Sequence, residues 1–159
     1  MMKYLIAALL LLLASTGGMA RTKTTQKSLR NATAVVEMLP PADTTQDSGD
    51  IDSRAVTLRG YSKRASDAKE SFFVTNNTRH RLSHITLLMR YTSMTGAMLH
   101  ERQVTIPVSL RAGESQLVAI KSWDVQKLFY YYAGPKPRKS ATAYRVAFRL
   151  MGYDIPVGI

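Results

Sequence analysis

The three histidines are the first residues to consider for catalysis or metal binding. His80 and His84 are four residues apart, which on one strand places them about 13 Å from each other at ~3.3 Å per residue. Two ligands of one metal ion lie much closer than that. His100 stands apart from both in the sequence. We therefore expect surface histidines and no metal site.

The sequence also lacks the patterns of hydrolases and nucleotide-binding enzymes. It contains no Gly-X-Ser-X-Gly elbow, and the 7 carboxylates after residue 50 are scattered singly rather than paired. Glycine-rich phosphate loops and dinucleotide fingerprints are absent. The lack of cysteine excludes disulfides, thiolate zinc sites and thiol nucleophiles. We therefore expect a non-enzyme that uses no cofactor.

The residues that could bind a ligand are aromatic and basic. The aromatic run Phe129 to Tyr132 precedes a Pro-rich loop with three cations. Because alternate residues of a strand point to opposite faces, half of these rings must leave the core. Either they form a patch for sugars and anions, or they pack beneath the loop and support the fold. The candidate binding residues here are Tyr130, Tyr131, Tyr132, Lys136, Arg138 and Lys139. Trp123, the only tryptophan, is either a core residue or an exposed platform.

A second basic set lies on predicted outward positions of strands. Its members are Arg81, Arg90, Arg145 and Arg149. If the strands at 82–91 and 143–153 share a sheet, these charges add up to a stripe that attracts polyanions, more weakly as salt rises.

The strands that must position these residues follow an N-terminal leader and a polar segment. Lys3, an apolar run from Leu5 to Ala14 and the small residues Gly18 and Ala20 are typical of a secretory signal peptide over 1–20, cleaved after Ala20. The apolar run is about 15 Å long as a helix, half of a bilayer core. Residues 21–50 are polar and lack aromatics, which predicts a flexible tether with one short strand at 33–38.

Residues 51–159 predict an all-β domain, an immunoglobulin-like or fibronectin-like antiparallel sandwich of about seven strands. Short segments of period two are separated by turn residues, with turns at 94–97 and 111–114. The third segment places Ile85, Leu87, Met89 and Tyr91 on one apolar face. Pro107 indicates an edge strand or a bulge. The expected strands are 55–61, 70–76, 82–91, 98–108, 116–123, 129–132 and 143–153.

The segment from about residue 70 to 121 resembles the FxLYD-type domains, which are small exported bacterial sandwiches. The resemblance rests on Asn76-Asn77-Thr78, the alternating strand that ends at Tyr91, the Gly96 turn and the Ala112-Gly113-Glu114 turn. The family's pattern has Asp after the Tyr and Pro before Gly-Glu, where this chain has Thr92 and Ala112. The resemblance implies a non-catalytic accessory or binding domain and brings no catalytic residues.

The net charge of +11 narrows the choice of partners. Residues 51–159 hold 17 Lys and Arg against 7 Asp and Glu, so the domain carries +10, whereas residues 21–50 balance to zero. Nucleic acid is a common partner of such basic chains, but the leader predicts export to the periplasm or cell surface. We therefore expect the partner to be an envelope protein or an anionic glycan such as lipopolysaccharide. Peripheral contact with a membrane is compatible with this charge, and the sequence leaves the oligomeric state open. A structural subunit that pairs through strand edges is the alternative, and a hydrolase is the least favoured.

Overall fold

The structure is a computed structural model that describes residues 34–40 and 51–158. The predicted signal peptide, its cleavage site and the rest of the predicted tether lie outside the described residues.

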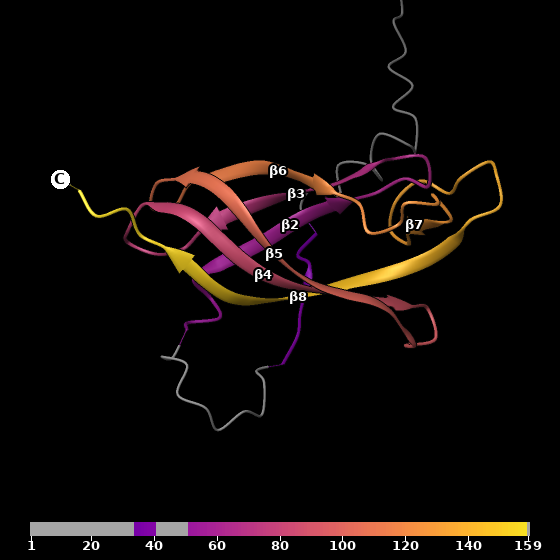
Figure 1. The fold of residues 1–159 in the computed structure, drawn as a ribbon, viewed down its shortest axis with the longest axis horizontal. Helices are drawn as coiled ribbons and strands as arrows, with labels where there is room; N and C mark the ends of the chain where they lie inside the picture. The colour runs from indigo at the N-terminus through magenta and orange to yellow at the C-terminus, as the bar shows by residue number, and fades with distance from the viewer. Residues whose placement is uncertain (1–33, 41–50, 159) are drawn as a thin grey trace, which may run out of the picture.

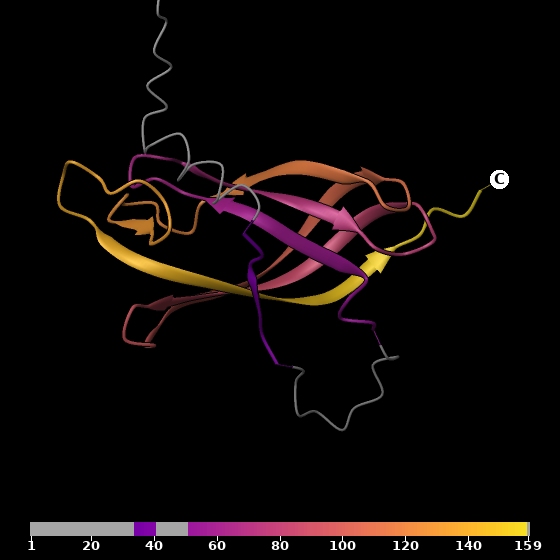
Figure 2. The ribbon, with the colours of Figure 1, turned by 180° about the vertical axis from the view of Figure 1, so that it is seen from behind.

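Eight strands form two facing sheets (Figures 1 and 2). They are β1 Glu37–Met38, β2 Val56–Ser62, β3 Lys69–Asn76, β4 Leu82–Ser93, β5 Met98–Leu110, β6 Ser115–Lys121, β7 Phe129–Tyr131 and β8 Thr142–Asp154. One sheet has the order β1-β8-β4-β5, with β7 also on β8, and the other has the order β2-β3-β6. The described residues contain no helix. The all-β sandwich is confirmed, and its immunoglobulin-like or fibronectin-like topology stays a prediction.

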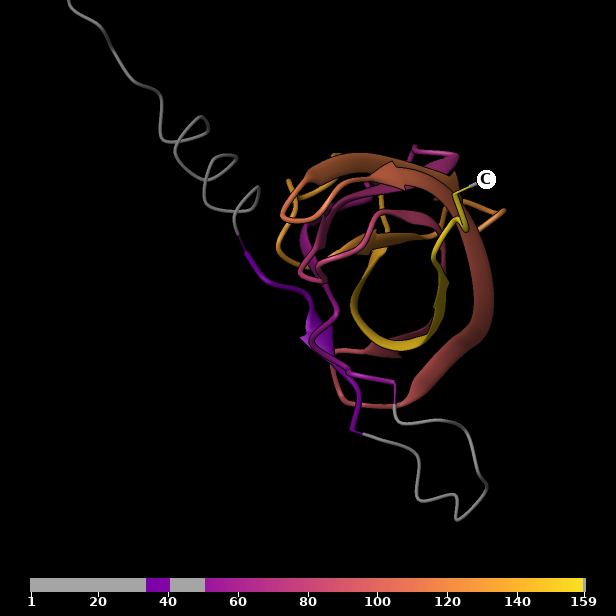
Figure 3. The same ribbon diagram turned by 90° about the vertical axis from the view of Figure 1, so that its left-hand side faces the viewer.

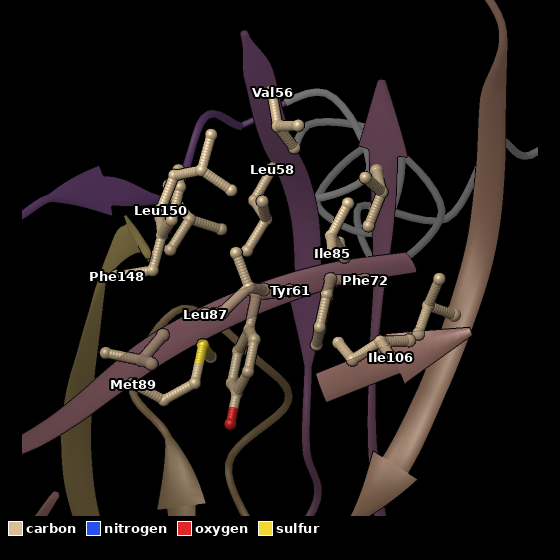
Figure 4. Packing of buried hydrophobic residues seen from close by; sticks show 14 of the residues in the cluster. Val56, Leu58, Tyr61, Phe72, Ile85, Leu87, Met89, Ile106, Phe148 and Leu150 are labelled. Atoms are coloured by element: carbon tan, nitrogen blue, oxygen red, sulfur yellow. The ribbon is translucent and has the colours of Figure 1, made fainter. Parts of the chain in front are cut away.

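The strands enclose the interior of the domain when it is viewed along its longest axis (Figure 3). The core side chains lie between the two sheets (Figure 4) and follow the period-two pattern of the sequence. The apolar face predicted for 82–91 is fully buried in β4, and Phe72 and Val74 of β3 face it from the other sheet. Tyr144, Val146, Phe148 and Leu150 give β8 the same alternation. Each large apolar side chain buried here contributes roughly 1.5–3 kcal/mol.

The predicted turns and the edge position of Pro107 are confirmed. Gly96 and Gly113 have φ of +92° and +75°, a conformation that residues with a side chain rarely adopt. Pro107 lies in β5, the edge of its sheet, where its missing N–H interrupts no ladder. The ladders are antiparallel except for β1 and β7, which run parallel to β8.

Residues 34–40 are part of the folded domain, although the sequence places the domain start at residue 51. The short strand expected at 33–38 is β1, and the same segment also pairs with the other sheet. Val36 N–H donates to Leu58 O at 2.9 Å, and Leu39 N–H donates to Phe148 O at 2.7 Å. The Val36 side chain is only 2% exposed. This segment therefore closes one side of the sandwich, which corrects the predicted boundary.

The opposite side of the sandwich lies between the edge strands β5 and β6. Two side chains bridge it: Arg102 of β5 donates to Lys121 O at 2.7 Å, and Gln116 of β6 accepts from Ser109 N–H at 3.2 Å. Both edges therefore lose part of their free backbone groups to side chains of the facing strand.

Candidate functional site

The predicted binding residues at 130–139 lie at the end of the sandwich that holds β7. Strand β6 ends here, β3 and β8 begin here, and the loop after β7 projects from the same end (Figures 1 and 2). The end is built on two buried carboxylates, Asp124 and Glu70.

Asp124 fixes the segment that leads into β7. Its carboxylate accepts from Lys63 Nζ at 2.9 Å and from the amides of Leu128 and Phe129 at 3.0 and 2.9 Å. Burial raises the pKa of Asp124, but these hydrogen bonds and the Lys63 charge outweigh burial and hold the pKa below its usual value. The segment after Asp124 forms a turn in which Lys127 has φ +59°. The ion pair thus anchors β7 to the end of β2.

Glu70 links the aromatic core to the edge of the sandwich. It is fully buried and accepts from Tyr61 OH at 2.8 Å, Tyr91 OH at 2.7 Å and the Trp123 amide at 3.0 Å. Arg102 neutralises it at 3.2 Å. Each oxygen of the Glu70 carboxylate thus accepts two hydrogen bonds from within the protein, so Glu70 holds the surrounding side chains together.

Burial raises the pKa of four tyrosines in this region. Desolvation is the largest cause for each, and it raises the pKa of Tyr131 to about 12. Glu70 adds to the same direction for the pKa of Tyr61, Tyr91 and Tyr144. Arg102 opposes it for Tyr91, and the hydrogen bond with Tyr61 opposes it for Tyr144. These phenols stay protonated and serve as hydrogen-bonding core residues.

The aromatic run alternates as a strand requires. Tyr131 is buried and contacts Tyr61 edge-on at 4.8 Å, while Phe129 packs on Trp123 at 5.0 Å. Trp123 is partly buried against the core. Tyr130 is half-buried, and Tyr132 is 46% exposed. Of the three predicted tyrosines, Tyr132 therefore offers the most surface to a ligand.

Arg145 and Tyr132 border a pocket of about 140 Å³. The Arg145 guanidinium lies 5.6 Å from the centre of the Tyr132 ring, within cation–π range. Val35 and Glu37 of the N-terminal segment line the pocket together with Tyr131 and Val146. Sequence analysis missed Val35 and Glu37, because only the pairing of β1 with β8 brings them here.

Exposed cations flank β7, one before the strand and three in the loop that follows it. Within the described residues, Lys127, Lys136, Arg138 and Lys139 are exposed and form no ion pair. Glu70 and Asp124 already have cationic partners in the interior. We call these four cations, with Tyr132 and Arg145, the cationic end.

The second predicted basic set is only partly brought together. Strands β4 and β8 are neighbours, so Arg90, Arg145 and Arg149 do share one outer face. Acidic residues interrupt the stripe. One row across the sheet contains Glu37, Ala147, Arg90 and Glu101, in the order β1, β8, β4 and β5, and Arg90 forms an ion pair with Glu101.

The other two arginines of this set are already engaged. Arg149 donates to Pro40 O at 2.9 Å. Arg81 precedes β4 and bonds Ser109 at 2.7 Å, far along the strands from Arg145. Only Arg145 of this set joins the cationic end.

No known protein family, curated protein or solved structure matches this chain. The likeness to FxLYD-type domains therefore stays a hypothesis. In the part of the chain that the structure describes, His, Asp and Glu form no group of three or more that could hold a metal ion. The same residues include no helix long and apolar enough to span a membrane.

Proposed function

We propose that the protein is an exported, non-catalytic binding module of the bacterial envelope that holds an anionic glycan at its cationic end. The observation that carries the proposal is the set of exposed, unpaired cations at 127–139 beside Tyr132 and Arg145. Unpaired cations on a surface attract polyanions, and the attraction weakens with salt.

The aromatic and basic groups of this end have complementary tasks in binding a glycan. The exposed Tyr132 ring offers a flat apolar surface for a sugar ring and a hydroxyl for its polar rim. Arg145 and the loop cations neutralise carboxylates or phosphates, and the Arg145 fork suits bidentate contacts. Glu37 at the pocket can accept hydrogen bonds from sugar hydroxyls.

The alternative is a structural subunit that pairs through strand edges. Contacts within the domain argue against this alternative, because residues 34–39 cover edges of β2 and β8, and side chains bridge β5 to β6. Proteins block edges in such ways to prevent pairing with other chains. The anionic glycan is therefore the favoured partner.

The test is retention on immobilised heparin and on lipopolysaccharide at low salt. The triple variant Lys136→Glu, Arg138→Glu and Lys139→Glu should lose retention while keeping its Tm, because these side chains are exposed and pair with no carboxylate of the residues that the structure describes. The matched control changes Arg54, Arg79 and Arg111 to Glu, which removes the same charge from the other end of the strands. Equal loss in both variants, or none in the first, would contradict the proposal.

A further inference from the structure

The outer face of the β2-β3-β6 sheet carries an apolar row that crosses it from side to side. Val35 pairs with Arg59 of β2, Arg59 lies opposite Phe73 of β3, and Phe73 lies opposite Leu117 of β6. Directly opposed residues point to the same face, with strands about 4.8 Å apart. Val35, Phe73 and Leu117 are 63%, 37% and 58% exposed. Phe73 and Leu117 are therefore adjacent and exposed, and Val35 lies in the same row beyond Arg59.

The surroundings of this row are small and polar. On one side Thr57, Thr75 and Ser115 are opposed across the three strands, and the Thr75 and Ser115 hydroxyls bond each other at 2.7 Å. On the other side Ser71 lies opposite Ala119. Short side chains on both sides leave the apolar row accessible to a broad, flat surface.

The charge of this face has one sign. Arg59, Lys69 and Lys121 are exposed, and Lys69 lies opposite Lys121. Glu70 is the only carboxylate in the three strands, and it points into the core with no exposed surface. A second copy of this chain would oppose its cations with the same cations, which disfavours face-to-face self-association.

We propose that this face docks a second protein, whose contact surface has an apolar centre surrounded by carboxylates. Burial of the Val35, Phe73 and Leu117 side chains supplies affinity, and Arg59, Lys69 and Lys121 select an acidic partner. A flat apolar row suits a protein better than an anionic glycan, which offers mainly polar groups. Val35 also lines the pocket beside Tyr132 and Arg145, but Phe73 and Leu117 do not, so the chain can join a glycan to a protein.

The experiment begins with site-specific photo-crosslinking of the full chain in the cells that make it. The photoreactive residue p-benzoylphenylalanine replaces Leu117, or Met98 as the control, which is 65% exposed at the β4–β5 hairpin. The Leu117 probe should give one adduct with a different protein, and the Met98 probe should not give that adduct. An adduct between two copies of the chain, or no protein adduct at Leu117, overturns the proposal.

The crosslinked protein is then purified, and its Kd for the full chain is measured. The double variant Phe73→Ser and Leu117→Ser, here called the serine pair, should weaken binding at least tenfold. Arg59→Glu should also weaken binding, and added salt should raise the Kd of the wild-type chain. The Lys136, Arg138 and Lys139 triple variant should bind as wild type does, which separates this surface from the cationic end. Wild-type affinity in both the serine pair and Arg59→Glu overturns the proposal. If the serine pair does not fold, the Kd of Arg59→Glu alone decides the test.

A membrane is the competing occupant of this face. Vesicles of phosphatidylcholine with about 30% phosphatidylglycerol provide the measurement, since an anionic lipid surface attracts exposed cations. Vesicle binding that the serine pair abolishes, without any protein adduct at Leu117, assigns the face to lipid and overturns the proposal.

Discussion

At the scale of single residues, buried charge determines how this domain is held together. Glu70 and Asp124 each have a cationic partner and additional hydrogen-bond donors, so neither is left unsatisfied. Such pairs add little net stability compared with a well-packed apolar core, but removing one member leaves the other group buried without a partner. The cost of losing one carboxylate is therefore large.

Glu70→Ala should lower the free energy of unfolding by about 3–5 kcal/mol, because Arg102 and two tyrosine hydroxyls lose their common acceptor. Glu70→Gln keeps one acceptor oxygen and should cost less. Glu101→Ala is the control, since its pair with Arg90 is partly exposed and worth about 0–1 kcal/mol. Urea unfolding measures all three, and equal losses for Glu70→Ala and Glu101→Ala would show that the buried network is not stabilising.

At the scale of elements, the segment 34–40 contacts both sheets and lines the candidate pocket. Val36 enters the core while Val35 and Glu37 on either side of it face outward. The strand pairing is short, so the buried Val36 side chain is the main anchor of the segment.

Val36→Asp should release the segment, because a carboxylate in the core lacks a partner. We expect faster hydrogen exchange at the amides of Val36, Leu39 and Gly60, which bond across the segment, and a loss of about 2–4 kcal/mol of stability. Val35→Asp places the same charge one residue earlier on the exposed side and should leave exchange unchanged. If the two variants exchange alike, the segment is not held by Val36.

The elements that sequence analysis predicted well are those with a strong local pattern. The alternation in β4 and β8 and the glycines at positions 96 and 113 are local signals, so strands and turns were predictable. The sequence predicts a short strand at 33–38, but it does not show that this strand joins the domain, because its partners lie in β2 and β8, far along the chain.

The candidate site was predictable only in part for the same reason. The cations at 136–139 follow from composition and loop residues. Strand order and register place Glu37 at the pocket. They also place Glu37 and Glu101 within the arginine stripe, which neither composition nor local pattern indicates.

At the scale of the whole molecule, several buried tyrosines couple the stability of the fold to alkaline pH. Tyr61, Tyr91, Tyr131 and Tyr144 have pKa values raised above the usual value near 10. The folded state therefore binds these protons more tightly than the unfolded state. The resulting stabilisation is complete below pH 10 and is lost as the pH rises toward the folded-state pKa values.

The free energy of unfolding should thus fall steadily between about pH 10 and 12. Urea unfolding at each pH, together with tyrosinate absorbance, measures the decline. Tyr131→Phe should remove the group whose pKa is raised to about 12 and make the decline shallower. Tyr130 contributes to none of these four shifts, so Tyr130→Phe is the control, and a flat profile up to pH 12 would rule out this coupling.

The position of the 34–40 segment also sets an order of folding. Its binding slot is made by β2 on one side and by β8, the last strand of the chain, on the other. The slot does not exist until the chain has folded through residue 148, and contacts between such distant residues close late because loop closure costs entropy. The part of the domain that is synthesised first is therefore the last to join it.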